Sequence, residues 1–345
     1  MRLTVGMCPA LTDEVLSKLK NAGIRNIMDF MLKDSEALAM ETSVSYKDLQ
    51  SIRRIIHAHY AAFAVPGDDL LGEAVRSAVV ISTGNTNLDS LLGGGIMTGE
   101  MMEICGSWSA GKTSLCVNLA VHAALKLGLS TLYVDPLINI SPLRLNHVVE
   151  ALSEEEEVVE QALARIKVVT PSDVWGIFQA LDLVRQPYFS VMGKNADSGA
   201  GGGANPMTGG GKIKLVIVDS LPSVLTPLLG RSQSQGRGII SHLATTLKSL
   251  ASEQQLAVVV VNNVVQADFS SMKSHGDEPH SRWKPGLGRF WAHVPNTRLF
   301  IEREDNSSTL PDCQSNNPKP LNVNVTIWKS TRLKMANTKF SIFSS

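Results

Sequence analysis

Apolar residues recur at helical spacing along the first part of the chain. Ile24, Ile27 and Met31 lie three and four positions apart, as residues on one face of an α-helix do. Thr12 precedes another such stretch, and its hydroxyl can cap the N-terminus of a helix. The pattern predicts a small all-α domain over residues 1–63.

Short apolar runs replace the helical pattern after residues 64–76, a stretch with Pro66 and Gly67 that we interpret as a linker. These runs have the length of buried strands and alternate with helical segments. The alternation predicts an α/β core over residues 77–345, with a mostly parallel twisted sheet flanked by helices. The strands are expected near residues 101–105, 131–135, 167–170, 215–219, 257–262 and 298–301.

One stretch of the predicted core has almost nothing apolar to bury. Residues 193–211 contain the run GAGGGANPMTGGG, and such a composition is typical of disordered segments. We predict a disordered glycine-rich insertion between a helix and a strand, and we assign it no function.

The charges of the chain balance, with 32 Lys and Arg against 32 Asp and Glu. No overall positive field attracts nucleic acid or a membrane, so contact with DNA would have to come from local loops. The four cysteines lack zinc-binding spacing, which favours free thiols in a reducing, intracellular compartment. The start of the chain lacks a signal sequence, and the longest apolar run, residues 256–261, is too short to cross a bilayer. We expect no membrane association.

A phosphate-binding motif lies between a predicted strand and a predicted helix. The sequence GSWSAGKT fits GxxxxGK[ST], where loop and helix N–H groups cradle phosphate oxygens. Lys112 is expected to contact the β and γ phosphates of ATP, and the Thr113 hydroxyl to bind Mg²⁺. The alternative is a glycine-rich turn with an unrelated lysine. The expected ATP-binding residues are Gly106, Ser107, Trp108, Ser109, Ala110, Gly111, Lys112, Thr113 and Ser114.

An acidic residue ends another predicted strand, LVIVDS, at the sheet edge where α/β proteins bind ligands. Asp219 there is expected to hold Mg²⁺ through water and, with Lys112, to form the catalytic pair. The alternative is that Asp219 only caps the next helix.

These residues belong to a longer stretch that resembles a known family. Residues 82–115, STGNTNLDSLLGGGIMTGEMMEICGSWSAGKTSL, are similar to the core opening of the eukaryotic and archaeal RecA-like recombinases. The resemblance continues through YVD, SPLRL, LVIVDS and VVVVNN. KPGLGRFWAHVPNTRLFIE, GMCPALTDE and SYKDL are most similar to the D-type paralogue branch. The resemblance implies a RecA-like P-loop core that binds ATP and Mg²⁺.

The resemblance also implies further binding residues. Arg144 matches the arginine that lies against adenine in the family, although it could be an ordinary surface arginine. Two DNA-facing loops correspond to residues 225–238 and 264–288, where cations could contact phosphates. Trp283 could stack on a base or cover a partner or the core. The candidate DNA-binding residues are Arg231, Arg237, Lys273, Arg282, Trp283 and Lys284.

The chain departs from the family pattern at three positions. Leu137 stands where the family has a glutamate that polarises the attacking water, and Asn263 replaces the glutamine that senses the γ phosphate. We therefore expect ATP to be bound well and hydrolysed slowly, at most as a DNA-dependent ATPase. Ser43 replaces a hairpin glycine that approaches DNA, which favours a helical domain that docks a partner.

The resemblance implies a nuclear adaptor in homologous-recombination DNA repair that helps load or stabilise the recombinase on single-stranded DNA. Its implied partners are single-stranded and branched DNA, a C-type paralogue on the core and a smaller X-ray cross-complementing paralogue on the N-terminal domain. The alternatives are an autonomous ATP-driven strand-exchange recombinase that forms its own filament, and a P-loop small-molecule kinase. The kinase would need an acceptor-binding lid that the sequence does not offer.

Overall fold

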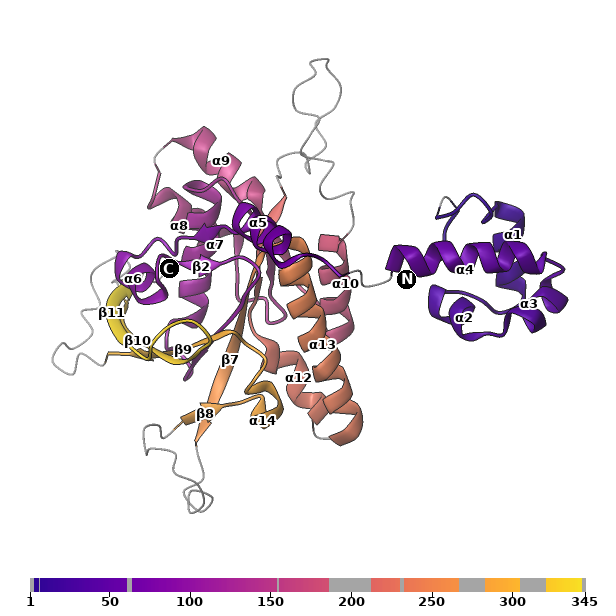
Figure 1. Cartoon of the computed structure of the whole chain (residues 1–345). Coiled ribbons are helices and arrows are strands. Elements are labelled where there is room, and N and C mark those ends of the chain that lie inside the picture. The colour runs from indigo at the N-terminus through magenta and orange to yellow at the C-terminus, as the bar shows by residue number, and fades with distance from the viewer. Residues whose placement is uncertain are drawn as a thin grey trace. The chain divides into compact units, whose positions relative to one another are not determined.

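The computed structural model describes residues 3–5, 7–60, 64–153, 155–185, 212–229, 233–266, 283–304 and 321–342. The chain divides into two compact units, residues 1–74 and 75–345, whose elements are labelled in Figure 1. The predicted glycine-rich insertion, residues 193–211, lies outside the described residues.

The N-terminal unit is helical, as predicted. The Thr12 hydroxyl accepts a hydrogen bond from the N–H of Val15 at 3.4 Å and caps the first helix. Arg53 donates to the carbonyls of Phe30 and Lys33, where the second helix ends. The helices are α1 (Asp13–Asn21), α2 (Ile27–Leu32), α3 (Ser35–Thr42) and α4 (Tyr46–Tyr60). The unit has its own core, which includes the buried side chains of Leu19, Phe30, Leu38, Leu49 and Ile52.

A further helix, α5 (Gly67–Ser77), occupies the stretch that we interpreted as a linker. None of its residues is buried, and Leu70, Leu71 and Val75 are exposed. The helix crosses the boundary between the two units.

The second unit is built on a sheet in the order β11-β10-β9-β3-β7-β6-β4-β5. Six of its strands pair in parallel, and they match the six that the sequence predicts: β3 (Met101–Gly106), β4 (Ser130–Val134), β5 (Ile166–Val169), β6 (Ile213–Val218), β7 (Ala257–Gln266) and β9 (Thr297–Arg303). Two antiparallel strands, β10 (Leu321–Ser330) and β11 (Asn337–Ile342), extend the sheet beyond β9. The short strands are β1 (Val80–Ile81) and β2 (Ile96–Met97), which pair with each other, and β8 (Trp283–Pro285), which pairs with β7.

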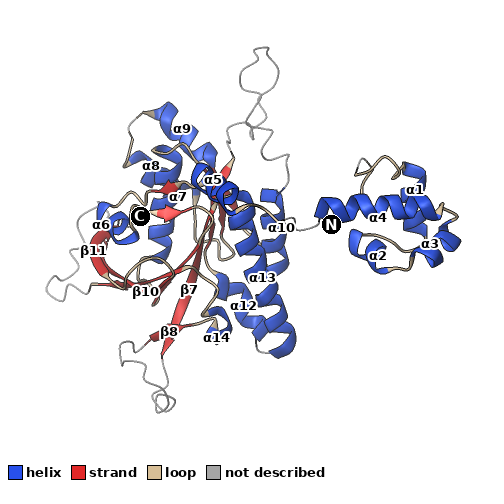
Figure 2. Cartoon of the chain, viewed as in Figure 1, coloured by secondary structure: helices blue, strands red, loops and turns tan. Residues whose placement is uncertain are grey.

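Helices cover both faces of this sheet (Figure 2). Successive residues of a strand point to opposite faces, so Tyr133 packs into one core cluster and its neighbour Val134 into the other. One cluster includes residues of α6 (Thr86–Leu92), α7 (Lys112–Leu125), α8 (Pro142–Glu150) and α9 (Glu156–Arg165). The other includes residues of α10 (Val174–Arg185), α12 (Leu221–Leu229), α13 (Gln233–Gln254) and α14 (Gly288–Trp291). The predicted α/β architecture is confirmed.

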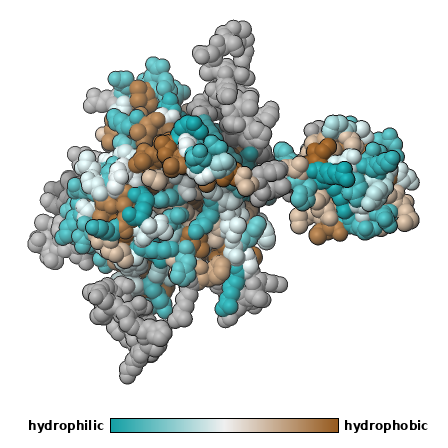
Figure 3. Space-filling model, viewed as in Figure 1, coloured by the Kyte–Doolittle hydropathy of each residue, from teal (hydrophilic) through white to brown (hydrophobic). Residues whose placement is uncertain are grey.

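Hydrophilic and apolar residues are interspersed on the surface that Figure 3 shows. This mixture agrees with the balanced charge of the chain. Among the described residues, no helix has the length and apolar character needed to cross a membrane.

Candidate nucleotide-binding site

The predicted phosphate-binding loop connects the end of β3 to the start of α7. Gly111 caps α7 with φ 93°, a left-handed conformation that glycine adopts without strain. Gly106 ends β3 so close to β9 that a Cβ added there would lie 2.6 Å from the carbonyl oxygen of Ile301. Glycine is therefore required at both ends of the turn for different reasons.

Lys112 is the first residue of α7, and its side chain folds back over the loop. Its Nζ donates to the carbonyl oxygens of Gly106 at 2.9 Å and Ser107 at 2.6 Å. Burial lowers the pKa of Lys112, and the nearby carboxylate of Asp219 acts in the opposite direction. An ammonium group is thus held inside the loop, where a phosphate would be bound.

Asp219 lies directly after β6 and is buried. Its Oδ2 accepts a hydrogen bond from the Tyr133 hydroxyl at 3.0 Å. Burial raises the pKa of Asp219, whereas hydrogen bonds from Thr113 and Tyr133 lower it. The Thr113 hydroxyl and the Asp219 carboxylate therefore lie next to each other, and these are oxygen donors of the kind that Mg²⁺ binds.

The loop borders a cavity of about 410 Å³, a volume in the range of small-molecule sites. Its described lining contains most of the residues predicted for ATP together with five that sequence reasoning missed: Asn139, Ser220, Val261, Arg303 and Leu321. Arg303 is the last residue of β9, and a cation at the carboxyl end of a predicted strand was the available signal. The predicted residues in the lining are Trp108, Ser109, Ala110, Gly111, Lys112, Thr113, Ser114, Arg144 and Asp219.

Arg144 lies in the wall of this cavity. Its Nη2 donates to the hydroxyl of Ser114 at 2.9 Å. This hydrogen bond joins α8 to the first turn of α7. Ser141 starts α8 by accepting a hydrogen bond from the backbone N–H of Arg144 at 3.2 Å. The guanidinium is thus positioned beside the loop, where a planar cation can contact a ligand.

Two of the three positions at which the resemblance implies a departure from the family pattern, Leu137 and Asn263, line the same cavity. The neighbouring acid, Asp135, is fully buried, and its oxygens accept from the backbone N–H groups of Leu137 at 3.3 Å and Ile140 at 2.8 Å. Asp135 therefore shapes the turn and does not face the cavity. In the part of the chain that the structure describes, Asp219 is the only carboxylate of the lining.

The DNA-binding candidates fall in three places. Arg237 is exposed on α13, and Lys284 is exposed on β8 beside the half-buried Trp283. The candidates Arg231, Lys273 and Arg282 lie outside the described residues.

The two expected DNA-facing loops need correction where the structure describes them. Residues 225–229 and 233–238 are helical, because Leu225 is buried in the core that α12 shares with the sheet. Residues 264–266 continue β7 and pair with residues 283–285 in an antiparallel ribbon. Among the residues described, residues 286–287 alone of the two expected loops therefore lie outside helix and strand.

The parallel sheet, the phosphate-binding loop after β3 and Asp219 after β6 define a RecA-like P-loop core. Two family descriptions match the chain: "RAD51D, N-terminal domain" over residues 1–58 and "Rad51" over residues 75–178. The chain belongs to the RAD51 family of DNA repair proteins, in its RAD51 homolog 4 (RAD51D) branch. The predicted family is confirmed.

Similarity to individual relatives extends over nearly the whole chain. It is 35% identical over 308 residues to DNA repair protein RAD51 homolog 4 of Bos taurus, covering 89% of this chain and 87% of the relative. The Mus musculus homolog 4 is 35% identical over 312 residues, covering 90% and 88%. DNA repair protein RAD51 of Saccharomyces cerevisiae is 27% identical over 311 residues, covering 82% and 67%.

Proposed function

We propose that this chain is an ATP-binding adaptor in recombinational DNA repair, which helps load or stabilise the strand-exchange recombinase on single-stranded DNA. The observation that carries the proposal is the cavity, which combines the phosphate-binding Lys112 with an apolar Leu137 at the position of the water-activating acid. Such a site binds ATP and turns it over slowly. Slow turnover suits a nucleotide-dependent switch in an assembly.

The roles of the site residues follow from their positions. Lys112 stabilises the β and γ phosphates, and the loop N–H groups orient them. Thr113 and Asp219 would hold Mg²⁺, which supplies charge neutralisation at the phosphates when bound. Arg144 contacts the adenine. Nothing in the described lining replaces the missing acid, so activation of water is the step that this chain lacks.

The division of the chain into two units supports a division of partners. The N-terminal unit carries its own core and exposes Met28, Leu32 and Met40 at 63%, 78% and 80%. Apolar side chains this exposed suit a protein partner better than DNA. In this proposal the N-terminal unit binds a smaller paralogue, the core binds a C-type paralogue, and the assembly acts in the nucleus.

The test is the composition of the complex that contains this chain, purified from cells with and without ATP. We expect a complex of defined size with related subunits that changes with ATP. Lys112→Ala should abolish both ATP binding and that change. Lys126→Ala is the matched control, because it removes an exposed lysine from the opposite end of the same helix.

The rival outcome is equally concrete. A chain that forms its own filament on single-stranded DNA, and hydrolyses ATP at the rate of a filament-forming recombinase, would establish the autonomous recombinase instead. A complex whose composition is the same for wild type and Lys112→Ala, with and without ATP, would remove the switch from the proposal.

A further inference from the structure

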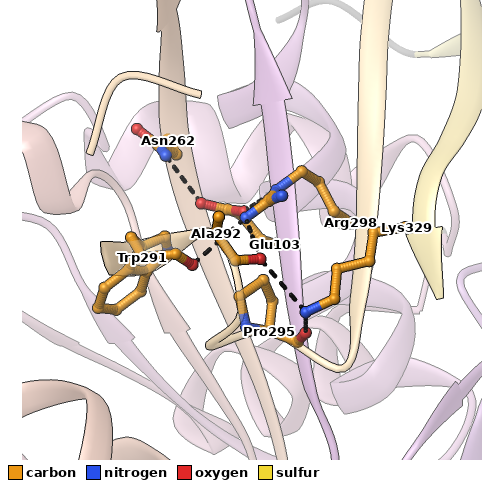
Figure 4. A network of polar contacts seen from close by, with 7 residues as sticks. All are labelled: Glu103, Asn262, Trp291, Ala292, Pro295, Arg298 and Lys329. Carbon is orange, nitrogen blue, oxygen red and sulfur yellow. Dashed lines mark hydrogen bonds and ion pairs between the residues drawn. The ribbon is translucent and has the colours of Figure 1, made fainter. Parts of the chain in front are cut away.

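A polar network is buried in the sheet behind the phosphate-binding loop (Figure 4). Its centre is an ion pair between Glu103 on β3, which is fully buried, and Arg298 on β9, which is 6% exposed. The other carboxylate oxygen of Glu103 accepts a hydrogen bond at 2.8 Å from the amide of Asn262 on β7. We call this set the Glu103 network, and its members are Glu103, Asn262, Trp291, Ala292, Pro295, Arg298 and Lys329.

Two cations of the network hold the turn that follows α14. The Arg298 guanidinium donates to the carbonyl oxygens of Trp291 at 3.4 Å and Ala292 at 3.2 Å. Lys329 Nζ donates to the carbonyl oxygens of Ala292 at 3.2 Å and Pro295 at 2.8 Å. Carbonyls at the C-terminal end of a helix favour such cations. Glu103 therefore neutralises a cation that is already engaged with this turn.

The ion pair is not required merely to attach the turn to β3. Asn296 does this without charge, because its side chain accepts from the Met101 N–H at 3.0 Å and its own N–H donates to the Met101 carbonyl at 2.8 Å. Burying an ion pair costs desolvation energy that apolar residues of the same size would not incur. Stability alone is thus a weak explanation for Glu103 and Arg298.

The network is also incompletely satisfied. Asn262 Oδ1 and Trp291 Nε1 are buried and find no hydrogen-bond partner among the described residues. Unsatisfied buried polar atoms destabilise the arrangement that contains them.

The position of the network connects the nucleotide cavity with the β7–β8 ribbon. Three residues beyond Glu103, β3 reaches Gly106, whose register partner is Asn263 in the cavity wall. The carbonyl of Asn263 accepts from the Gly286 N–H at 2.8 Å, next to the ribbon of residues 264–266 and 283–285. Movement of Gly106 would therefore act on β7 where the ribbon begins. Through Glu103 and Arg298, the same movement would act on the turn that follows α14.

We propose that Glu103 is a positioning residue that couples nucleotide occupancy of the cavity to the β7–β8 ribbon. Its carboxylate joins β3 to Asn262, which precedes the ribbon on β7, and to Arg298, which holds the turn after α14. Both therefore follow the strand that enters the phosphate-binding loop. The inference rests on the proposed binding of ATP and goes beyond it, because it specifies how occupancy of the cavity reaches the ribbon.

Amide hydrogen exchange of the ribbon in the full-length protein tests the coupling. In wild type, ATP with Mg²⁺ should slow exchange of the Val265 and Lys284 amides on the order of tenfold, which is a coupling of ~1.4 kcal/mol. Glu103→Gln should bind ATP within about threefold of wild type while the slowing falls below about twofold. The reason is that Glu103 accepts with both oxygens, whereas glutamine has one acceptor oxygen and must release one partner.

Two further variants serve as a control and as an alternative to Glu103→Gln. Glu100→Gln makes the same change at the residue before β3, where Glu100 forms a partly exposed ion pair with Arg332, and it should leave the response intact. Glu103→Met with Arg298→Met removes both charges together, which buried pairs tolerate well, and should also abolish the response. It covers the case in which Glu103→Gln alone does not fold.

The possible failures are distinguishable. A ribbon that responds to ATP in the Glu103 variants as in wild type would overturn the coupling. Wild type that binds ATP without any change in the ribbon would overturn the coupling and leave the proposed function standing. Wild type that does not bind ATP would overturn the proposed function, and the coupling with it.

Discussion

Gly106 offers a direct test of how tightly the phosphate-binding loop is packed against the sheet. In Gly106→Ala the new methyl group would lie 2.6 Å from the backbone oxygen of Ile301 and 2.8 Å from its Cγ2. The oxygen belongs to β9, which pairs with β3 at this residue, so it cannot rotate away as a side chain could. The two strands must move apart at the entrance of the loop.

The size of the effect follows from the kind of contact. Overpacking a buried site by one methyl group costs roughly 1–3 kcal/mol, which should lower the melting temperature of the core by about 2–12 °C. ATP affinity should fall more than tenfold, roughly 1.4 kcal/mol or more, because the carbonyl of Gly106 also holds Lys112. Calorimetry and ATP titration of the full-length variant measure the two effects.

Gly238→Ala is the matched control for Gly106→Ala. Gly238 is exposed on α13 and has no atom within 4 Å of an added Cβ, so alanine there should be neutral or stabilise by about 0.5–1 kcal/mol. If Gly106→Ala melted and bound ATP as wild type does, the close approach of β3 and β9 at the loop would be wrong.

Three further outcomes are expected. Leu137→Glu should raise ATP hydrolysis in the assembled complex, measured by phosphate release, with the exposed Leu127→Glu on the same core as control; equal rates for all three proteins would show that another group activates water. Lys284→Ala should weaken single-stranded DNA binding and reduce its salt slope by about one unit, whereas Lys18→Ala should not, and an unchanged slope would favour a partner surface at β8. A fragment of residues 1–76 should be soluble and helical by circular dichroism because the N-terminal unit has its own core and should retain the smaller paralogue in a pull-down; capture by the core fragment alone would reverse the assignment.

The parallel part of the sheet could be predicted from sequence, because each strand is a short apolar run buried on both faces. The strands β10 and β11 were missed. Val323, Val325 and Ile327 are buried at every second position of β10, which is a period-two pattern. That pattern shows a strand, but it does not show that the strand pairs with β9 in an antiparallel direction, since pairing depends on residues far away in the chain.

The same limit applies to the site. The phosphate-binding loop is a local motif, so its residues and their roles could be predicted together. Tyr133, Arg303 and Leu321 come from β4, β9 and β10, and only the order of the strands places them near Lys112 or Asp219. The buried partners of Glu103 were missed for the same reason, because Asn262 and Arg298 reach it from the neighbouring strands β7 and β9.

Exposure of the residues at the cavity supports the proposal that this chain binds ATP but turns it over slowly. Leu137 is 48% exposed, so its side chain does little for the core, and an acid there would be compatible with folding. Leucine in place of the acid that the resemblance implies would therefore remove a chemical group at almost no cost in stability. Trp108, also in the cavity lining, is 79% exposed, and apolar groups gathered at the mouth of a polar site favour cover by a protein surface. Together these features fit a subunit that retains ATP inside an assembly, where a neighbour rather than this chain would have to supply the acid for hydrolysis.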